Sequence, residues 1–453
     1  MPVGEGHRTG VGAHRTVAPP RISPHVLLFA LLFVGGTTFG VWTSQIRPST
    51  RLAALLATAA HLTGLLAGLG MLAMLLLMTR VPAVEHGIGA DTLARWHARG
   101  GRTVILLTLA HAGLAWWAHS AYNHMGPVDG LLDVLGYPAL AAATFGCALL
   151  VAVAVFSARA VRTRVSHETW LRVHLLTYVG TAIAFFHQPA GPDLAGAPVL
   201  AWLWTFLHVQ VAVLLLWYRV VVPLCALRRH DIRVVRVYDE TPDVVSVLMT
   251  GRGLASLDAA SGQFFRWRFL TRRLWWTSLP FSVSAPVRDD TLRITVKVVG
   301  AHTRRVKRLR PGTRVLATGP FGAMTARRRT RRKVLLIAGG IGITPMRALF
   351  ETLPGEPGDI TLLYRASDSA QLALREELEE IAWRRSCRVH YLLGSSRGPD
   401  NPFTSAGLRR LVPDIGEHDV YLCGSPDMAR ATLRILRRAG VPRGQVHAEV
   451  FDA

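Results

Sequence analysis

The sequence contains few cysteines, few lysines and few acidic residues for its 453 positions. Four cysteines without a Cys-x-x-Cys pair exclude a disulfide framework and a zinc knuckle. The 29 acidic side chains stand against 52 basic ones, which leaves a formal net charge of +23. Half of the residues are apolar, so the chain is not disordered. No recognition module or aromatic stacking platform accompanies the charge, and we expect no nucleic-acid partner.

The charged residues are unevenly distributed along the chain. Residues 1–222 hold 7 Asp or Glu and 14 Arg, whereas residues 223–453 hold 22 Asp or Glu and 38 Arg or Lys. The first half is therefore charge-poor and apolar, and the second has a soluble, although basic, composition. These halves predict a membrane domain followed by a soluble domain. Two basic runs in the second half, 304–310 and 327–333, favour contact with anionic lipid.

Apolar blocks in the first half are long enough to cross a bilayer, which takes about 20 residues. Arginine gathers before the first block and in alternate loops, whereas the loops at 122–133 and 189–198 contain neither Lys nor Arg. The positive-inside rule then places the N-terminus and the whole second half in the cytosol. We therefore predict a multi-pass protein of the cell membrane, partnered by the lipid bilayer, with six spans near 25–43, 52–78, 103–121, 134–156, 169–188 and 199–222.

Two of the predicted spans contain histidines, and polar side chains inside a membrane are costly and usually functional. The third span, extended to its cytosolic end, carries His97 and His111, and the fifth carries His174 and His187. Both spans run from inside to outside, so we expect His97 to be level with His174 and His111 with His187. The two levels are separated by roughly 20 Å.

Two facing pairs at two depths suit two stacked haems, each with both axial positions filled by imidazole, and such haems pass electrons. On a regular helix a spacing of 14 residues returns within about 40° of the same face, whereas a spacing of 13 misses it by about 140°. The fifth span must therefore bend, bulge or present its ligands from different angles. His61, His119 and His208 are explained by structural hydrogen bonds or by the lining of an access channel.

The second half changes its pattern at about residue 330. Short alternating strands over 231–325 predict a small antiparallel barrel, and from 334 repeated strand–helix units predict a parallel sheet. A glycine-rich turn at 339–342 can bind a pyrophosphate, and Cys423-Gly424 lies at the same sheet edge. We expect a multi-domain chain with a basic tail (1–24), an all-α six-helix transmembrane bundle (25–225), a β-barrel domain (226–326) and an α/β domain (327–453).

With these motifs in this order, the chain resembles the ferric reductase and NADPH oxidase superfamily. In that family a six-helix, two-haem membrane domain precedes a ferredoxin–NADP reductase-type dehydrogenase. The resemblance covers roughly residues 25–453, and the histidine spacings of 14 and 13 match those of the family. It implies FAD in the barrel domain, NAD(P) in the α/β domain, and two haem b groups ligated by the four histidines.

The family motifs also imply which residues bind the flavin. Leu279-Pro280-Phe281-Ser282 stands where the family has a motif that places an aromatic ring over the flavin and a hydroxyl on the FAD. Leu279 replaces the usual basic residue, so the FAD pyrophosphate would be anchored by other residues. The resemblance implies further flavin contacts at Lys297, Gly300, His302, Thr303, Gly322 and Phe451.

A second group of motifs implies the nucleotide site. The segment 339–345 matches the family's nicotinamide-nucleotide loop, and the segment 423–426 resembles its Cys-Gly-Pro motif. Arg365 stands where NADPH-dependent members bind the 2′-phosphate, and a planar guanidinium suits that dianion, so NADPH is favoured over NADH. The other implied nucleotide contacts are Gly339, Gly340, Gly342, Thr344, Pro345, Cys423 and Gly424.

The resemblance implies an enzyme, an NAD(P)H-dependent flavocytochrome that passes electrons from cytosolic NADPH through FAD and two haems to a small acceptor outside. It implies no catalytic side chain, and no obligate protein partner is evident. Cations for the inner haem's propionates are expected among Arg95, Arg99, Arg102 and Arg172.

Two acceptors, a ferric chelate and O2, remain open. Family oxidases commonly have a His where this chain has Ala115, which slightly favours ferric reduction over superoxide formation. From the residues alone, a His-lined proton or metal transporter with a regulatory flavin domain is a further alternative.

Overall fold

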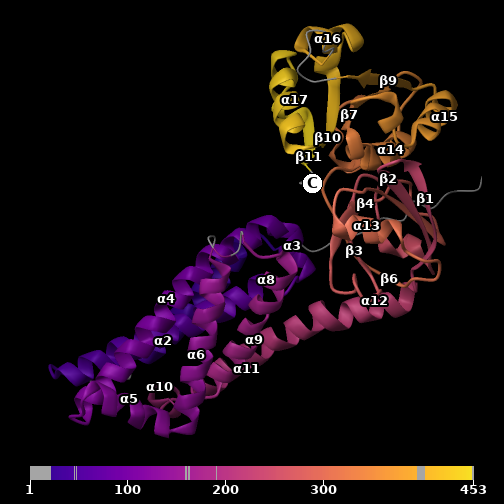
Figure 1. The fold of residues 1–453 in the computed structure, drawn as a ribbon. Helices are drawn as coiled ribbons and strands as arrows, with labels where there is room; N and C mark the ends of the chain where they lie inside the picture. The colour runs from indigo at the N-terminus through magenta and orange to yellow at the C-terminus, as the bar shows by residue number, and fades with distance from the viewer. Residues whose placement is uncertain are drawn as a thin grey trace, which may run out of the picture. The chain divides into compact units, whose positions relative to one another are not determined.

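The structure is a computed structural model that describes residues 22–44, 46, 48–158, 161, 164–189, 191–394 and 403–450. The chain divides into two compact units, Met1–Val222 and Pro223–Ala453. Within the described residues the first unit is helical, whereas the second combines strands and helices (Figure 1).

The first unit is built from apolar helices, several of which begin with proline in the first turn, where no backbone N–H is needed. Its elements are α1 (Pro24–Thr43), α2 (Leu52–Leu77), α3 (Pro82–Ile88), α4 (Ala90–Tyr122), α5 (Pro127–Gly136), α6 (Pro138–Ser157), α8 (His167–His174), α9 (Leu176–Phe185), α10 (Pro192–Ala195), α11 (Pro198–Leu216) and the π-helical turn η1 (Trp217–Val221). Helix α12 (Val222–His230) continues into the second unit.

Five helical segments in the described part of the chain are long and apolar enough to cross a membrane: Pro24–Thr43, Leu52–Leu77, Thr92–Tyr122, Pro138–Ser157 and Pro198–His230. The predicted count of six is not reproduced, because the expected span 169–188 is interrupted. Helix α8 ends at His174, and α9 begins at Leu176. The Thr177 hydroxyl donates to the His174 carbonyl and Tyr178 N–H donates to the Leu175 carbonyl, so the backbone tightens at this point.

The first part of the second unit, which we call the β domain, contains two three-stranded antiparallel sheets. Their strand orders are β1-β2-β5 and β4-β3-β6, and single bridges at Arg233–Arg314 and Val283–Ile294 link them. The structure therefore has two linked sheets where the sequence predicted one small barrel. The elements are β1 (Arg233–Thr241), β2 (Val244–Thr250), β3 (Phe264–Phe269), β4 (Leu279–Ser282), β5 (Thr291–Lys297), α13 (Ala301–Lys307) and β6 (Val315–Phe321).

The last part of the chain, which we call the nucleotide domain, is built on a parallel sheet with the order β11-β10-β7-β8-β9, and this confirms the predicted strand–helix units. Its strands are β7 (Lys333–Gly339), β8 (Ile360–Ala366), β9 (Arg388–Leu393), β10 (His418–Gly424) and β11 (Val446–Val450). Its helices are α14 (Ile343–Thr352), α15 (Arg375–Arg385), α16 (Ser405–Leu411) and α17 (Pro426–Arg438).

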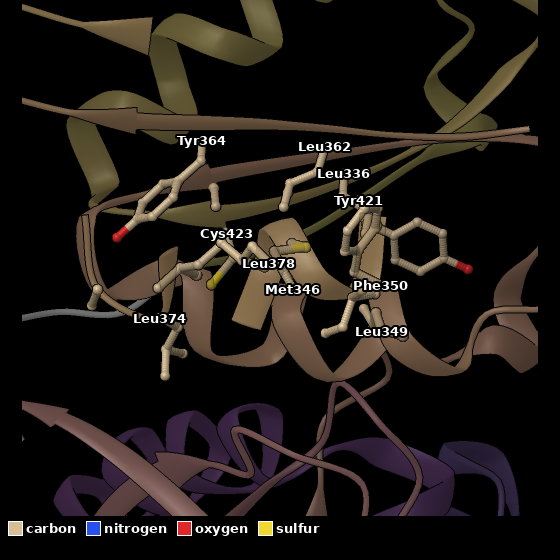
Figure 2. Close-up of a cluster of buried hydrophobic side chains, with 14 of the residues drawn as sticks. Leu336, Met346, Leu349, Phe350, Leu362, Tyr364, Leu374, Leu378, Tyr421 and Cys423 are labelled. Atoms are coloured by element: carbon tan, nitrogen blue, oxygen red, sulfur yellow. The ribbon is translucent and has the colours of Figure 1, made fainter. Parts of the chain in front are cut away.

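Alternate residues of the sheet face two hydrophobic clusters, as the two-residue period of a strand requires. Leu336 and Leu362 face a cluster with Met346, Phe350 and Tyr421 that buries α14 and α15 (Figure 2). The residues between them, such as Leu335 and Leu363, face the cluster that buries α16 and α17. The sheet edge that carries the glycine-rich turn is therefore held by a core on both faces.

Short 3-10 helices connect several of these elements. In the second unit they are η2 (Leu254–Leu257), η3 (Ala326–Arg328), η4 (Gly340–Gly342), η5 (Ser369–Gln371), η6 (Ile415–Glu417) and η7 (Arg443–Gln445).

Candidate redox sites

The first unit, Met1–Val222, which we call the membrane unit, has four histidine rings that lie in two facing pairs. The ring centroids of His97 and His174 are 5.9 Å apart, and those of His111 and His187 are 6.1 Å apart. In the first pair, His97 lies near the start of α4 and His174 is the last residue of α8. In the second pair, His111 lies two-thirds along α4 and His187 lies two residues beyond α9. The structure thus brings together the same partners that the sequence predicted.

Each of these four rings has its Nδ1 held by a hydrogen bond. The partners are the carbonyl of Met74 at 3.1 Å for His97, the carbonyl of Ala60 at 2.8 Å for His111 and the carbonyl of Ala184 for His187. His174 Nδ1 contacts the Ser157 hydroxyl at 3.2 Å. A histidine that ligates a metal usually donates its other ring N–H in this way, which fixes the tautomer and leaves Nε2 for the metal.

The ring separations fit an iron between the two members of each pair. A metal–nitrogen bond is about 2 Å long and the ring centre lies about 1 Å beyond the nitrogen, so two imidazoles on one metal have centroids about 6 Å apart. Each pair supplies only two ligands, as a haem with four porphyrin nitrogens requires. Among the described residues, no three His, Cys, Asp or Glu side chains gather to hold a bare ion.

Close packing on α2 supports the second pair. A Cβ placed on Gly64 would lie 2.7 Å from Nδ1 of His111, so only glycine leaves room for the ring at this point. The Nδ1–H of the same ring donates to the Ala60 carbonyl, one helical turn earlier. Sequence reasoning missed Gly64, because no sequence pattern shows that α2 packs against the ring of His111.

The first pair has an aromatic and a basic neighbour. Trp170 stacks on His174 with ring centroids 5.0 Å apart, and its indole N–H donates to the Ser157 hydroxyl that contacts the same histidine. Arg219, on the π-helical turn η1, donates to the Met78 carbonyl, one turn along α2 from the carbonyl that binds His97. Sequence reasoning missed Arg219, although a lone Arg near a membrane span was a visible signal.

The arginines expected near the inner haem are less directly placed. Arg95, Arg99 and Arg102 lie on α4 within two turns of His97 with exposed side chains, and Arg172 lies on α8 two residues before His174. Arg95 donates to the Thr92 hydroxyl at 2.9 Å.

Outside these pairs, two other histidines have polar partners of their own. His119 Nε2 lies 2.8 Å from a carboxylate oxygen of Asp133, and His208 Nδ1 contacts the Trp204 carbonyl at 2.9 Å. Both contacts agree with the structural hydrogen bonds expected for these residues.

The expected flavin motif forms strand β4. Ser282 is 3% exposed, and its hydroxyl is buried without a hydrogen-bond partner among the described residues. An orphaned buried hydroxyl is costly, so a ligand atom at this position would satisfy it. Phe281 is half-buried beside it, its carbonyl accepts from the Trp267 indole N–H at 2.9 Å, and Pro280 is exposed.

The second expected flavin segment is already engaged within the β domain. Lys297 lies 3.3 Å from Asp243, and the Thr303 hydroxyl accepts from the N–H groups of Val299 and Gly300 at 3.0 Å. His302 lies on the same short helix, α13. Phe451 lies outside the described residues.

The glycine-rich turn packs tightly against the end of β10. A Cβ on Gly342 would lie 2.2 Å from the Cys423 carbonyl, and one on Gly339 would lie 1.9 Å from the Met428 sulfur. Gly340 has φ +53, a left-handed conformation that glycine adopts without strain. Thr344 and Pro345 are buried in the first turn of α14, and Gly424 is buried at the end of β10.

Arg365 occupies the expected place at this edge. Parallel pairing puts it opposite Gly339, the first residue of the turn, and its guanidinium lies 5.6 Å from the centre of the Phe403 ring. Burial lowers the pKa of Arg365, so a phosphate dianion would be a favourable partner.

A buried carboxyl beside Cys423 was missed by sequence reasoning. Glu449 pairs with Cys423 across β10 and β11, accepts from the Ala323 N–H at 3.1 Å, and lies where a Cβ on Gly322 would meet it. Burial raises the pKa of Glu449 and of the Cys423 thiol. The carboxyl is therefore biased toward its neutral form and the thiol toward its protonated, weakly nucleophilic form.

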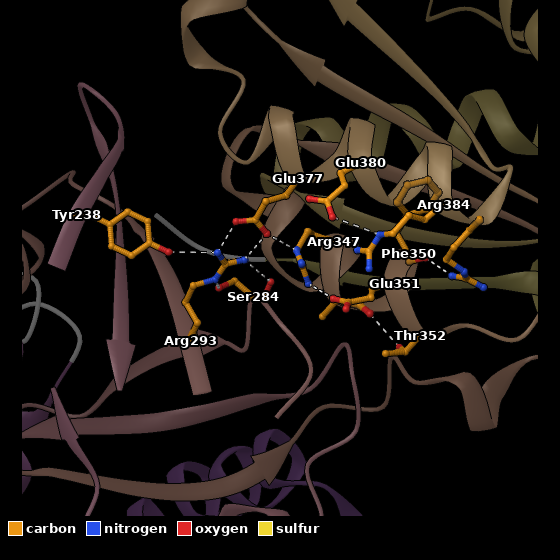
Figure 3. Close-up of polar contacts among 12 residues, drawn as sticks. Tyr238, Ser284, Arg293, Arg347, Phe350, Glu351, Thr352, Glu377, Glu380 and Arg384 are labelled. Carbon is orange, nitrogen blue, oxygen red and sulfur yellow. Dashed lines mark hydrogen bonds and ion pairs between the residues drawn. The ribbon is translucent and has the colours of Figure 1, made fainter. Parts of the chain in front are cut away.

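An ionic network joins the β domain to the nucleotide domain (Figure 3). Arg293 on β5 is 8% exposed and donates to both carboxylate oxygens of Glu377 on α15, at 2.5 and 2.7 Å. Arg347 on α14 donates to the same carboxylate at 2.7 Å and pairs with Glu351. Burial alone would raise the pKa of Glu377, but its bonds to Arg293 and Arg347 hold that pKa below the ordinary value. The helix that follows the glycine-rich turn is thereby tied to the β domain.

Comparison with known proteins supports the division of the chain into two units. Residues 63–185 match the family described as the ferric reductase like transmembrane component, and residues 336–434 match the oxidoreductase NAD-binding domain. The ferredoxin reductase component of 3-ketosteroid-9-alpha-monooxygenase from Mycolicibacterium smegmatis is 30% identical over 236 residues, which are 49% of this chain and 65% of that protein. This chain thus spans less than two thirds of that relative.

Two further proteins are similar to part of the chain. Ferredoxin–NADP reductase B from Sorangium cellulosum is 29% identical over 175 residues, which are 36% of this chain and 71% of that protein. The solved ferredoxin reductase of carbazole 1,9a-dioxygenase is 24% identical and covers 49% of this chain and 68% of its own, with a TM-score of 0.42.

The chain therefore joins a unit whose helices are long and apolar enough to cross a membrane, and which contains the ferric reductase like segment, to a second unit. This second unit, which we call the reductase unit, contains the oxidoreductase NAD-binding domain. In this chain the two matched segments occur in the order found in the fused ferric reductase and NADPH oxidase superfamily, and the chain has the architecture of that superfamily. The resemblance drawn from the sequence motifs is therefore confirmed.

Proposed function

We propose that this protein carries electrons from NADPH in the cytosol to a ferric chelate on the outer face of the cell membrane. The observation that carries the proposal is the arrangement of His97, His174, His111 and His187, with two ring pairs about 6 Å apart and every Nδ1 hydrogen-bonded. Axial ligation of two haems that transfer electrons across the bilayer is the simplest function for such histidine pairs.

The proposed ligands are His97 and His174 for the inner haem and His111 and His187 for the outer one. When bound, FAD takes electrons from NADPH as a pair and releases them singly, and each haem passes one electron at a time. The chain's own residues hold these groups. The carbonyls of α2 orient two of the four imidazoles, and Arg219 offers a cation one turn from His97's partner for a propionate.

The proposed flavin site lies along β4, with the Ser282 hydroxyl as a hydrogen-bonding partner and Phe281 against the ring. Lys297, Gly300, His302, Thr303, Gly322 and Phe451 are proposed flavin contacts as well. Because Lys297 and Thr303 already have partners within the chain, their contacts would require those bonds to be shared or exchanged.

The proposed nucleotide site follows the edge of the parallel sheet from the turn at 339–342 to Cys423 and Gly424, with Thr344 and Pro345 behind it. Arg365, opposite Gly339, would bind the 2′-phosphate and select NADPH. The name of the Sorangium relative, a ferredoxin–NADP reductase, agrees with this choice.

The test uses the full-length protein in proteoliposomes, with NADPH on the side of the nucleotide domain and ferric citrate on the other side. We expect a reduced-minus-oxidised spectrum of two six-coordinate haems and ferric reduction that persists under strict anaerobiosis. His111→Ala should remove the absorbance of one haem and stop ferric reduction, while NADPH still reduces the flavin. His119→Ala, eight residues further along α4, is the matched control and should keep both haems.

A protein that shows no Soret band when expressed with ample haem would contradict the proposal and favour the transporter alternative. Cytochrome c reduction that superoxide dismutase abolishes, without anaerobic ferric reduction, would identify O2 as the acceptor instead.

A further inference from the structure

One surface turn of the β domain combines two tryptophans with two arginines. It connects β3 to β4 over residues 270–278, Leu-Thr-Arg-Arg-Leu-Trp-Trp-Thr-Ser, and we call it the tryptophan turn. Trp275 is 56% exposed and Leu270 is 37% exposed. The rings of Trp275 and Trp276 stack with centroids 5.1 Å apart and planes 7° apart. Apolar surface of this kind usually marks an interaction site.

The turn has a fixed conformation. Leu274 is 1% exposed and packs in the core of the β domain. Its sequence neighbours Arg272, Arg273 and Trp275 are exposed. The Thr271 carbonyl accepts from the N–H groups of Leu274 at 3.1 Å and Trp275 at 3.0 Å. Leu274 therefore acts as an inward anchor, and the charged and aromatic side chains are presented outward together.

The turn also lies at the end of the β domain where the chain arrives from the membrane span. The Leu270 N–H donates to the Arg314 carbonyl at 2.9 Å, and the Arg314 guanidinium lies 3.3 Å from Asp231. Asp231 directly follows α12, which is the last part of the candidate span Pro198–His230. Only a few residues separate this end of the β domain from a helix that is long and apolar enough to cross a bilayer.

We propose that the tryptophan turn is a lipid-binding site that inserts its indoles into the bilayer interface and binds anionic phospholipid headgroups through Arg272 and Arg273. Tryptophan prefers the headgroup level because its ring is apolar with one polar N–H, and arginine reaches lipid phosphates at the same depth. The net charge of +23 makes an anionic surface the favourable partner.

This site gives the reductase unit a second attachment to the membrane besides α12. A unit tethered through one helix can rotate about the tether, and a contact at the tryptophan turn restricts that rotation. An exposed tryptophan next to an arginine also occurs outside the β domain: Trp383 is 84% exposed and precedes Arg384 on α15 of the nucleotide domain. Trp383 is therefore a natural control.

The experiment uses the full-length protein in nanodiscs of phosphatidylcholine with photoactivatable phosphatidylglycerol. After illumination, mass spectrometry measures lipid adducts on the peptide that contains residues 270–278 and on the peptide that contains Trp383. We expect adducts on the first peptide and none on the second. The double variant Arg272→Glu/Arg273→Glu should reduce the adducts at least about fivefold, and Trp275→Ser should reduce them as well. Trp383→Ser should leave them unchanged.

The flavin content of each variant, measured from its absorbance, separates lipid binding from flavin binding. Full flavin content with reduced adducts supports the proposal. Equal adducts on both peptides, no adducts on residues 270–278, or flavin loss in Trp275→Ser with adducts unchanged would overturn it. The last result would assign the turn to the flavin site.

Discussion

At the scale of single residues, Gly64 on α2 leaves room for the ring of His111. The added methyl group of Gly64→Ala would lie 2.7 Å from the ring nitrogen, so the ring must move and lose its bond to the Ala60 carbonyl. Loss of such a supporting contact typically weakens metal binding about 10- to 100-fold. We expect the proposed outer haem to be largely lost at limiting haem, as measured by the reduced-minus-oxidised spectrum per protein.

Gly113→Ala provides the matched control for this substitution. Gly113 lies on α4 two residues beyond His111, yet nothing lies within 4 Å of a Cβ placed there. Alanine also favours a helix over glycine by about 1 kcal/mol, so this variant should fold at least as well as the parent. Equal haem content in the two variants would show that Gly64 does not position the ring.

Glu449 shows at the same scale why a site can be only partly visible in a sequence. A Glu on a short strand near the end of a chain carries no signal of burial. Its role emerges from parallel pairing, which sets it opposite Cys423, and from the turn at Gly322, which covers it. The motif residues on either side were predictable because each has a characteristic local spacing.

At the scale of secondary-structure elements, the network of Arg293, Glu377 and Arg347 should stabilise the reductase unit. Glu377→Gln removes the charge that both arginines share, and the side chains of Arg293 and Arg347 are each only 9% exposed. We expect the free energy of unfolding at pH 7 to fall by about 2 kcal/mol, less than for a fully buried pair because Glu377 is 31% exposed. A lower midpoint temperature for the thermal release of flavin from the full-length protein would report this loss of stability.

Glu380→Gln on the same helix is the control, because Glu380 is 64% exposed and pairs with Arg384 at 3.4 Å. An exposed pair contributes less than about 1 kcal/mol. The pKa of Glu377 is lower in the folded protein than its ordinary value of 4.5, so its stabilisation is present above that value and is lost as the pH falls through the folded pKa. The stabilities of Glu377→Gln and the parent should therefore converge once the pH falls below the folded pKa of Glu377; a gap that persists in acid would exclude the ionic explanation.

The interrupted fifth span illustrates what periodicity alone can predict. A spacing of 13 residues indicated that a straight helix could not present both histidines, and the structure places His174 at the end of α8 and His187 beyond the end of α9. The position of the break was not predictable, because it depends on the Thr177 hydroxyl binding a carbonyl and on packing against α6. Strand pairing in the β domain was hidden for a similar reason, since it joins segments far apart in the chain.

At the scale of the whole molecule, the division into a membrane unit and a reductase unit was predictable because it depends on composition, which is summed over hundreds of residues. The ionic link between the β domain and the nucleotide domain was not, since Arg293 and Glu377 are 84 positions apart. Contacts of this range are set by how the sheets are placed, and no local pattern records them.

The orientation of the chain in the membrane is the remaining prediction at this scale. In the background Cys225→Ser, which removes an exposed thiol, Tyr122→Cys introduces a thiol at the end of α4, where the native side chain is 77% exposed. Ser256→Cys introduces one on the exposed surface of the β domain. The arginine distribution places the first thiol outside and the second in the cytosol. An impermeant maleimide should label Tyr122→Cys in intact cells and Ser256→Cys only after permeabilisation, and the reverse pattern would put the reductase unit on the wrong side for cytosolic NADPH.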